Sequence, residues 1–196
     1  MTLKGKLVIE GEHAVGQRPS ALSRFLGFLL VVVIVIAAAW ALRTYVIEPF
    51  QIPSASMEET IQTGDMVFTE KVSYHFEEPQ PGEIVVFPDP QVPSRVLIKR
   101  VIATEGQTVN LIDGDVYVDG EKLDEPYTLG KQSVPLGNPV GVIITYPYTV
   151  PDGYVWVMGD NRTNSSDSRY FGPVQTSLVF GKAVMVYWPV DHFGWL

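Results

Sequence analysis

Hydrophobic residues follow two very different patterns along the chain. Residues 25–42 contain no charged side chain and no polar group other than the Trp40 indole. As a helix, this run spans about 27 Å, close to the thickness of the hydrocarbon core of a bilayer. Arg24 and Arg43 flank the run, and Trp40 and Tyr45 lie near its end, where interfacial aromatic residues are common. The pattern predicts a transmembrane helix over residues 25–43.

Two other interpretations of this run are weaker. A buried core helix is disfavoured because the run is apolar on every side. A cleaved signal peptide would explain the Ala-x-Ala patterns at residues 37–41, but its apolar core normally has about 7–15 residues. Four basic residues precede the run and only Arg43 follows closely, so we expect a cytoplasmic amino terminus and a single-pass protein whose remaining chain lies outside the membrane.

The rest of the chain alternates short β-branched or aromatic runs with turn residues. These runs lie at residues 65–69, 83–87, 96–102, 116–118, 154–158 and 183–188, each bounded by Gly, Pro, Asp or Asn. Asp119-Gly120 predicts a hairpin turn, and the Gly- and Pro-rich residues 127–148 predict a long surface excursion. We therefore expect a cytoplasmic segment (1–24), a transmembrane helix (25–43) and a mainly β, antiparallel domain (44–196) with one core.

Charge and composition exclude several classes of function. The net charge is +3 over residues 1–43 and −11 over the remainder, for a total of −8, which disfavours a nucleic-acid partner. The chain has no cysteine, and His13, His75 and His192 are far apart in sequence. We expect neither a metal nor an organic cofactor, so that any hydrolytic chemistry must come from Ser, Thr, Lys, Asp or Glu.

A serine turn and a lysine in an apolar strand are the first candidates for chemistry. Pro-Ser-Ala-Ser-Met at residues 53–57 could by itself be an ordinary polar turn. Strand alternation places Lys99 on one face with Leu97 and Val101. A lysine among such neighbours loses hydration and its pKa falls, which favours a neutral amine that can act as general base for a serine. The plainer interpretation of Lys99 is a strand-end lysine whose amine reaches solvent.

A polar loop is the third candidate. Residues 159–169 read Gly-Asp-Asn-Arg-Thr-Asn-Ser-Ser-Asp-Ser-Arg, directly after the 154–158 run. The plainer interpretation is an ordered turn held by an Asp167–Arg169 pair. Networks of this kind often support a site without reacting themselves.

Four segments together resemble type I signal peptidases, which are membrane-anchored serine–lysine proteases. They are residues 53–57, Gly-Glu-Ile-Val-Val-Phe at 82–87, Ile-Lys-Arg-Val at 98–101 and the loop at 159–169, in this order after the apolar run. The resemblance implies Ser56 as nucleophile and Lys99 as general base. It implies Ser54 and the Ser56 N–H as oxyanion donors, and Ser165 as a hydrogen-bond partner of Lys99. It implies Asp167 with Arg169 as a supporting pair. It also implies shallow apolar pockets for small side chains, lined by Phe50, Ile52, Ile61, Leu97 and Ile98.

The sequence departs from the family pattern in two places. After Met57 the family usually has x-Pro-Thr-Leu, whereas this chain has Glu58 followed by Glu59-Thr60-Ile61. After Val101 the family tends toward Gly-x-Pro-Gly-Asp, whereas this chain has Ile-Ala-Thr-Glu-Gly-Gln. Neither change touches a reacting group, so both bear on pocket shape and substrate preference.

The resemblance implies an enzyme that removes signal peptides from exported preproteins after Ala-x-Ala, at the outer surface of a bacterial plasma membrane. Its expected partners are preproteins and the lipid bilayer. Two alternatives remain: a peptidase dedicated to one partner, such as a pilus subunit, and a membrane-tethered β binding module without catalysis.

Overall fold

The computed structural model describes residues 20–137 and 142–196. The chain divides into two compact units, the first ending at Trp40 and the second running from Ala41 to Leu196. Most of the expected cytoplasmic segment, residues 1–19, lies outside the described residues, and so does His13.

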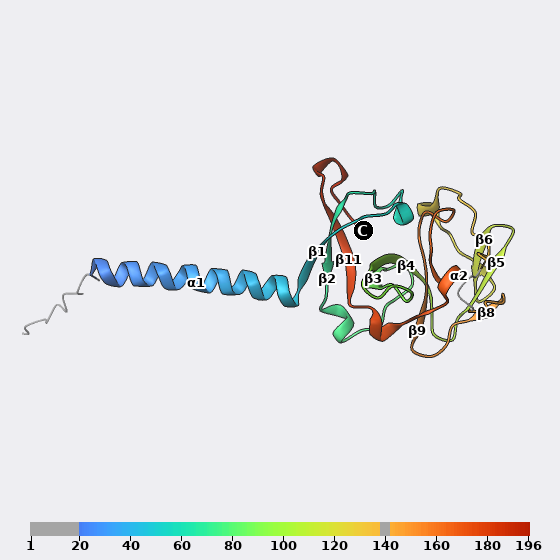
Figure 1. Cartoon of the computed structure of the whole chain (residues 1–196), viewed down its shortest axis with the longest axis horizontal. Helices are drawn as coiled ribbons and strands as arrows, with labels where there is room; N and C mark the ends of the chain where they lie inside the picture. The colour runs from blue at the N-terminus through green and yellow to red at the C-terminus, as the bar shows by residue number, and fades with distance from the viewer. Residues whose placement is uncertain (1–19, 138–141) are drawn as a thin grey trace, which may run out of the picture. The chain divides into compact units, whose positions relative to one another are not determined.

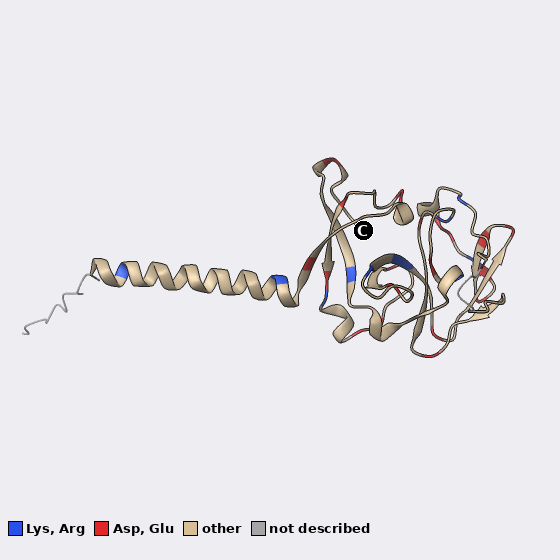
Figure 2. Cartoon of the chain, in the orientation of Figure 1, with Lys and Arg blue, Asp and Glu red and all other residues tan. Residues whose placement is uncertain are grey.

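Helix α1 (Ala21–Tyr45) contains the predicted membrane run and begins before and ends after the predicted range 25–43. Ser20 caps its start, because Ser23 N donates a hydrogen bond to Ser20 Oγ (3.2 Å). None of the helix side chains is buried, and its two basic residues appear as blue bands in Figure 2. By length and composition, α1 can cross a membrane.

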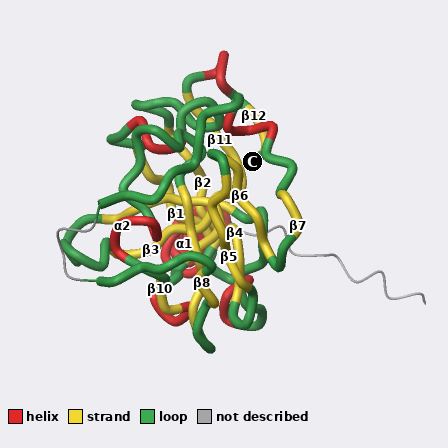
Figure 3. Tube along the Cα trace, turned by 90° about the vertical axis from the view of Figure 1, so that its right-hand side faces the viewer, coloured by secondary structure: helices red, strands yellow, loops and turns green. Residues whose placement is uncertain are grey.

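The second unit is mainly antiparallel β, which confirms the predicted fold class (Figures 1 and 3). Its larger sheet has eight strands. Their order is β1 (Ile47–Gln51), β2 (Met66–Glu70), β11 (Gly181–Trp188), β3 (Ile84–Pro88), β4 (Val96–Thr104), β9 (Tyr154–Met158) and β10 (Val174–Gln175), with β12 (Gly194–Trp195) paired to β11.

A smaller sheet of four strands occupies the opposite end of this unit from β1 and β2 (Figure 1). Its order is β7 (Glu121–Lys122), β6 (Asp115–Val118), β5 (Thr108–Ile112) and β8 (Tyr148–Thr149). The predicted hairpin joins β6 to β7. Asp119 and Gly120 have φ angles of 53° and 86°, the two positive values that a type I′ turn requires.

The predicted surface excursion at residues 127–148 is only partly a surface feature. Its described residues have little regular structure beyond the end of the 3₁₀ helix η3 (Pro126–Thr128) and the start of β8. However, Ser133 is buried, and the rings of Tyr146 and Tyr148 pack against Trp156 with centroids 6.0 and 5.0 Å away. Aromatic residues within this Gly- and Pro-rich segment therefore cover part of the core.

Two apolar clusters lie on either face of β3 and β4, and the first of them holds the serine turn. The first contains Ile52, Met57, Ile61, Val67, Ile84, Val86, Ile98, Ala183 and Val186. The second contains Val85, Phe87, Val101 and residues of β9, with Leu97 packed against it. Met57 and Ile61 are completely buried, so residues 53–61 are fixed to the sheet by their own apolar side chains.

Gly181 of β11 lies against β2 with no room for a side chain. A Cβ atom there would lie 2.3 Å from Thr69 Cγ2 and 2.9 Å from Glu70 O. We expect Gly181→Ala to lower the free energy of unfolding by about 1–3 kcal/mol, measured by urea denaturation of the full-length protein in detergent micelles. Gly137→Ala is the control, because a Cβ there meets nothing within 4 Å. An equal loss in both variants would contradict the steric argument.

Candidate active site

The turn that carries Ser56 is anchored at both ends. Ile52 N donates to Asp65 O (2.9 Å), and Gly64 N donates to Ile52 O (2.8 Å), which closes the base of the segment. The 3₁₀ helix η1 (Ala55–Met57) then directs Met57 into the core. Ser56 retains 8% of its accessible surface, so its hydroxyl is held in place yet reachable from a cavity.

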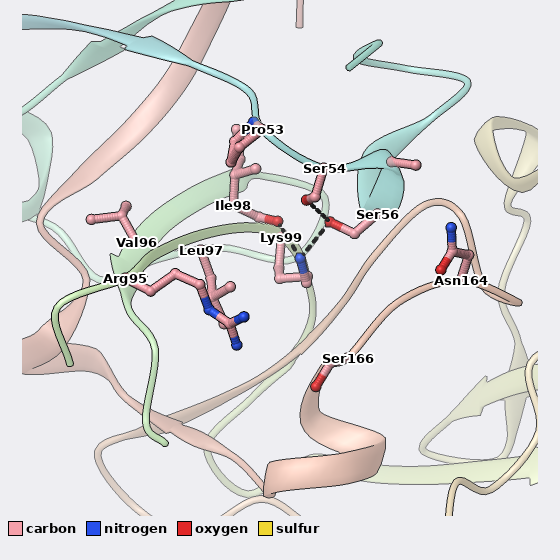
Figure 4. A pocket seen from close by; sticks show the side chains of 11 residues that line it. Pro53, Ser54, Ser56, Arg95, Val96, Leu97, Ile98, Lys99, Asn164 and Ser166 are labelled. Atoms are coloured by element: carbon pink, nitrogen blue, oxygen red, sulfur yellow. Dashed lines mark hydrogen bonds between the residues drawn. The ribbon is translucent and has the colours of Figure 1, made fainter. Parts of the chain in front are cut away.

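Lys99 lies within hydrogen-bond distance of Ser56, although the two residues are 43 positions apart in sequence. The lysine is on β4, paired with Val85 of β3, and is 1% exposed. Its Nζ donates to Ser56 Oγ (2.7 Å) and to Ile98 O (2.8 Å) (Figure 4). The amine therefore faces the hydroxyl with its position fixed by a backbone carbonyl.

The surroundings of Lys99 favour its neutral form. Burial lowers the pKa of Lys99 from 10.5 to about 8, because the ammonium loses its hydration. The carboxylates of Asp167, Asp160 and Asp89 oppose this decrease in pKa. The positive charge of Arg95 adds to the decrease. A substantial fraction of Lys99 is thus neutral at mildly alkaline pH.

Ser54 lies beside the Ser56–Lys99 pair. Its Oγ is 3.5 Å from Ser56 Oγ, and the side chain is exposed at the edge of the cavity (Figure 4). A second hydroxyl is therefore available next to the one that faces the amine.

The predicted Asp167–Arg169 pair is completely buried and organises the loop after β9. Asp167 accepts hydrogen bonds from Arg169 Nε and Nη2 (both 2.8 Å) and from Gly159 N (3.0 Å), and it caps the short helix α2 (Ser168–Phe171). Arg169 Nη2 also donates to Arg162 O (2.8 Å). The pair therefore ties both ends of the loop together.

The same loop contacts the serine turn through two residues that the sequence did not single out. Asn161 N donates to Ser56 O (3.1 Å), and Asn161 Nδ2 donates to Ala55 O (2.9 Å). Gly159 is in direct contact, since a Cβ there would lie 2.4 Å from Ser56 O. Their place in the 159–169 loop was the available signal, but sequence spacing does not reveal which loop residue reaches the turn.

Ser165 does not make the expected hydrogen bond to Lys99. Its Oγ is shielded from solvent and has no hydrogen-bond partner among the described residues. The side chain lies instead against Gly159, where a Cβ would be 2.3 Å from Ser165 Oγ. The structure therefore places Ser165 beside the serine turn, with its hydroxyl unpaired.

A second buried ion pair, also absent from the sequence predictions, lies next to the site. Arg100 Nε and Nη2 donate to Asp160 (2.9 and 2.6 Å), and Thr60 Oγ1 donates to Asp160 Oδ2 (2.5 Å). The Arg100 guanidinium also lies 4.1 Å from the centre of the Tyr127 ring. These contacts connect β4, the serine turn and the 159–169 loop.

Two neighbouring cavities contain most of the residues expected to bind substrate. The Ser56 cavity, about 340 Å³, is lined by residues 53–56 and 95–99, Asn164 and Ser166 (Figure 4). The Phe50 cavity, about 190 Å³, is lined by residues 50–53, Val86 and residues 95–98. Phe50, Ile52, Leu97 and Ile98 thus line one or both cavities. Ile61 lines neither, because it is completely buried in the core beside Met57.

The two acidic residues that depart from the family pattern form contacts outside both cavities. Glu58 accepts a hydrogen bond from Thr63 Oγ1 (3.0 Å), and Glu59 forms an ion pair with Lys131 (3.1 Å). Neither glutamate lines the Ser56 cavity or the Phe50 cavity. In residues 20–137 and 142–196, no group of three or more His, Cys, Asp or Glu side chains is arranged to hold a metal ion.

Comparison with known proteins gives consistent matches over most of the chain. Residues 25–188 match the family model described as signal peptidase, peptidase S26. A probable signal peptidase I-1 of Synechocystis is 43% identical over 175 residues, covering 86% of this chain and 84% of the relative. A signal peptidase I of Leptolyngbya laminosa is 37% identical, and the match covers 81% of this chain and 77% of the relative. A crystal structure of a signal peptidase I from Enterococcus faecalis is 32% identical and covers 54% of this chain and 97% of its own, with a TM-score of 0.43.

The Asp167–Arg169 pair gives a prediction for stability. Asp167→Ala leaves Arg169 buried without a counter-charge, so we expect the free energy of unfolding to fall by about 3–5 kcal/mol. Asp115→Ala breaks the solvent-exposed ion pair with Lys122 and should leave stability essentially unchanged. Urea denaturation of both full-length variants measures the difference. Similar unfolding midpoints for the two variants would show that Asp167 does not stabilise the loop.

Proposed function

This chain belongs to the signal peptidase family, peptidase S26, and we propose that it removes signal peptides with Ser56 as nucleophile and Lys99 as general base. The observation that carries the assignment is the 2.7 Å contact between Lys99 Nζ and Ser56 Oγ at the wall of a cavity. The pKa of Lys99, lowered to about 8, makes the neutral amine available without a histidine.

The proposed reaction begins with the neutral form of Lys99. Its Nζ accepts the Ser56 proton while Oγ attacks the substrate carbonyl carbon, and Ile98 O holds the amine in place. The Ser54 hydroxyl and the Ser56 N–H would stabilise the oxyanion, where each such donor is typically worth about 3–4 kcal/mol. Lys99 then gives its proton to the leaving amine and activates the water that hydrolyses the acyl-enzyme.

Asp167, Arg169 and Ser165 act in this proposal by positioning the reacting groups. Asp167 and Arg169 hold the loop whose Asn161 contacts Ser56 O, so they fix the backbone of the nucleophile. The unpaired Ser165 hydroxyl lies against Gly159, the residue that is packed against Ser56 O.

The two adjacent cavities support the proposed pattern of Ala-x-Ala, in which two side chains of the substrate are bound. In an extended peptide, residues i and i+2 lie on one face, about 7 Å apart. The Ser56 cavity would accept the small residue before the cleaved bond, and the Phe50 cavity, with Phe50, Ile52, Leu97 and Ile98, would accept the residue two positions earlier.

We also propose that α1 anchors the enzyme as a single-pass helix in the plasma membrane. The basic residues before the apolar run favour a cytoplasmic amino terminus (1–24), a membrane segment (25–43) and an outer catalytic domain (44–196). Glu58 and Glu59 line neither cavity, so nothing at the site favours a peptidase dedicated to one partner.

The catalytic assignment is tested with single substitutions. We expect Ser56→Ala and Lys99→Ala to reduce cleavage of an Ala-x-Ala preprotein by at least about 10³-fold, as loss of a nucleophile or its base does elsewhere. The enzyme is assayed in detergent micelles, and the new amino terminus is identified by mass spectrometry. Ser73→Ala and Lys122→Ala serve as controls outside the site. If either site variant kept the wild-type rate, the assignment would fail.

The pH dependence of cleavage tests the state of Lys99. The reactive form is the neutral amine, which increases as pH rises through the pKa of Lys99. We therefore expect kcat/KM to rise with pH with a midpoint at about 8. A profile that stays flat from pH 6 to pH 10 would be incompatible with a lysine base.

A further inference from the structure

The Ser56 cavity and the Phe50 cavity share one wall. Pro53 and residues 95–98 line both cavities. Arg95 is the charged residue among these shared positions, and its side chain is 56% exposed. Figure 4 shows this side chain extending alongside Leu97. A residue with a positively charged, partly exposed side chain therefore lies at the boundary between the two cavities.

An extended substrate brings one particular residue to this boundary. Successive side chains of an extended chain point to opposite sides. When the residue before the cleaved bond occupies the Ser56 cavity and the residue two positions earlier occupies the Phe50 cavity, the residue between them passes over the shared wall. Its side chain points away from the cavity floors, and Arg95 is the charged residue of the wall that it crosses.

Asp89 holds Arg95 in place for such a contact. The Asp89 carboxylate is buried and accepts hydrogen bonds from Arg95 Nε (2.6 Å), from Arg95 Nη2 and from Gln91 N (2.8 Å). Asp89 N also donates to Arg95 O (2.8 Å), which closes the turn between β3 and β4. Arg95 Nη1 has no hydrogen bond to any residue that the structure describes. Its two N–H groups remain available to a ligand.

We propose that Arg95 selects the middle residue of the small-x-small cleavage site, favouring an acidic side chain and disfavouring a basic one. The inference rests on the proposed function, since it needs a substrate bound across both cavities. The counter-charge of Asp89 lies beneath the guanidinium with its oxygens occupied, so an approaching side chain meets the N–H groups of Arg95 first.

A merely structural role for Arg95 makes a different prediction. If Arg95 only closed the β3–β4 turn, its replacement would change the rates for all substrates by the same factor. Selection by charge changes the ratio between substrates instead. Because such a ratio compares two substrates on one enzyme, effects of the substitution on folding or on Lys99 cancel.

The test uses the full-length enzyme in detergent micelles and three preproteins that differ only at the middle residue. Their cleavage sites are Ala-Glu-Ala, Ala-Gln-Ala and Ala-Lys-Ala, and they compete in one reaction that mass spectrometry follows. We expect wild type to prefer Glu over Lys by about fivefold, as attraction and repulsion at a partly exposed charge allow. Arg95→Gln should bring this ratio close to one, and Arg95→Lys should restore part of it. Lys122→Gln, the matched control outside both cavities, should keep the wild-type ratio.

The possible outcomes separate this inference from the proposed function. Equal cleavage of the Glu and Lys substrates by wild type, or an unchanged ratio in Arg95→Gln, would overturn the selection by Arg95 while the peptidase activity stands. Failure of wild type to cleave even the Ala-Gln-Ala substrate would refute the proposed function, and the selection by Arg95 with it.

Discussion

The burial of the Lys99 amine next to Ser56 is the constraint on which the rest of the site depends. Removing an ammonium ion from water costs several kcal/mol, so a buried lysine becomes easier to deprotonate. The position of β4 between β3 and β9 provides this burial, and Ile98 O and Ser56 Oγ accept hydrogen bonds from Nζ. The fold therefore creates an amine with a pKa of about 8, the proposed base, from a side chain that is otherwise charged at this pH.

The proposed base is fixed in a sheet, and the proposed nucleophile must be held with equal accuracy; here the backbone holds it. Met57 fixes one side of the turn in the core, while Asn161 donates to the carbonyls of Ser56 and Ala55. The contact with Gly159 leaves no room for a Cβ. The main effect of the Asp167–Arg169 pair is thus to maintain the shape of the loop, because a buried ion pair adds little net stability relative to apolar packing.

The sequence predicted the features that depend on local pattern and missed those that depend on distant contacts. The apolar run at residues 25–42 predicted α1, and the run at residues 96–102 predicted β4 with Lys99 inside it. Asp119-Gly120 predicted the hairpin. Strand β1 was missed because Pro49 interrupts its pattern, which is tolerated since β1 lies at a sheet edge. The Arg100–Asp160 pair and the packing of Ile61 in the core arise from contacts between distant segments, which no periodicity encodes.

One pattern explains how three carboxylates can lie near Lys99 without keeping it protonated. Asp167, Asp160 and Asp89 are all buried, and each would raise the pKa of Lys99. Each carboxylate also accepts hydrogen bonds from Nε and Nη2 of one arginine. These arginines are Arg169, Arg100 and Arg95, respectively. The positive charge of Arg95 lowers the pKa of Lys99 in turn, and desolvation by burial, the largest effect, determines the result. The arginines therefore do more than hold the loops together, because each places a positive charge against a carboxylate that raises the pKa of Lys99.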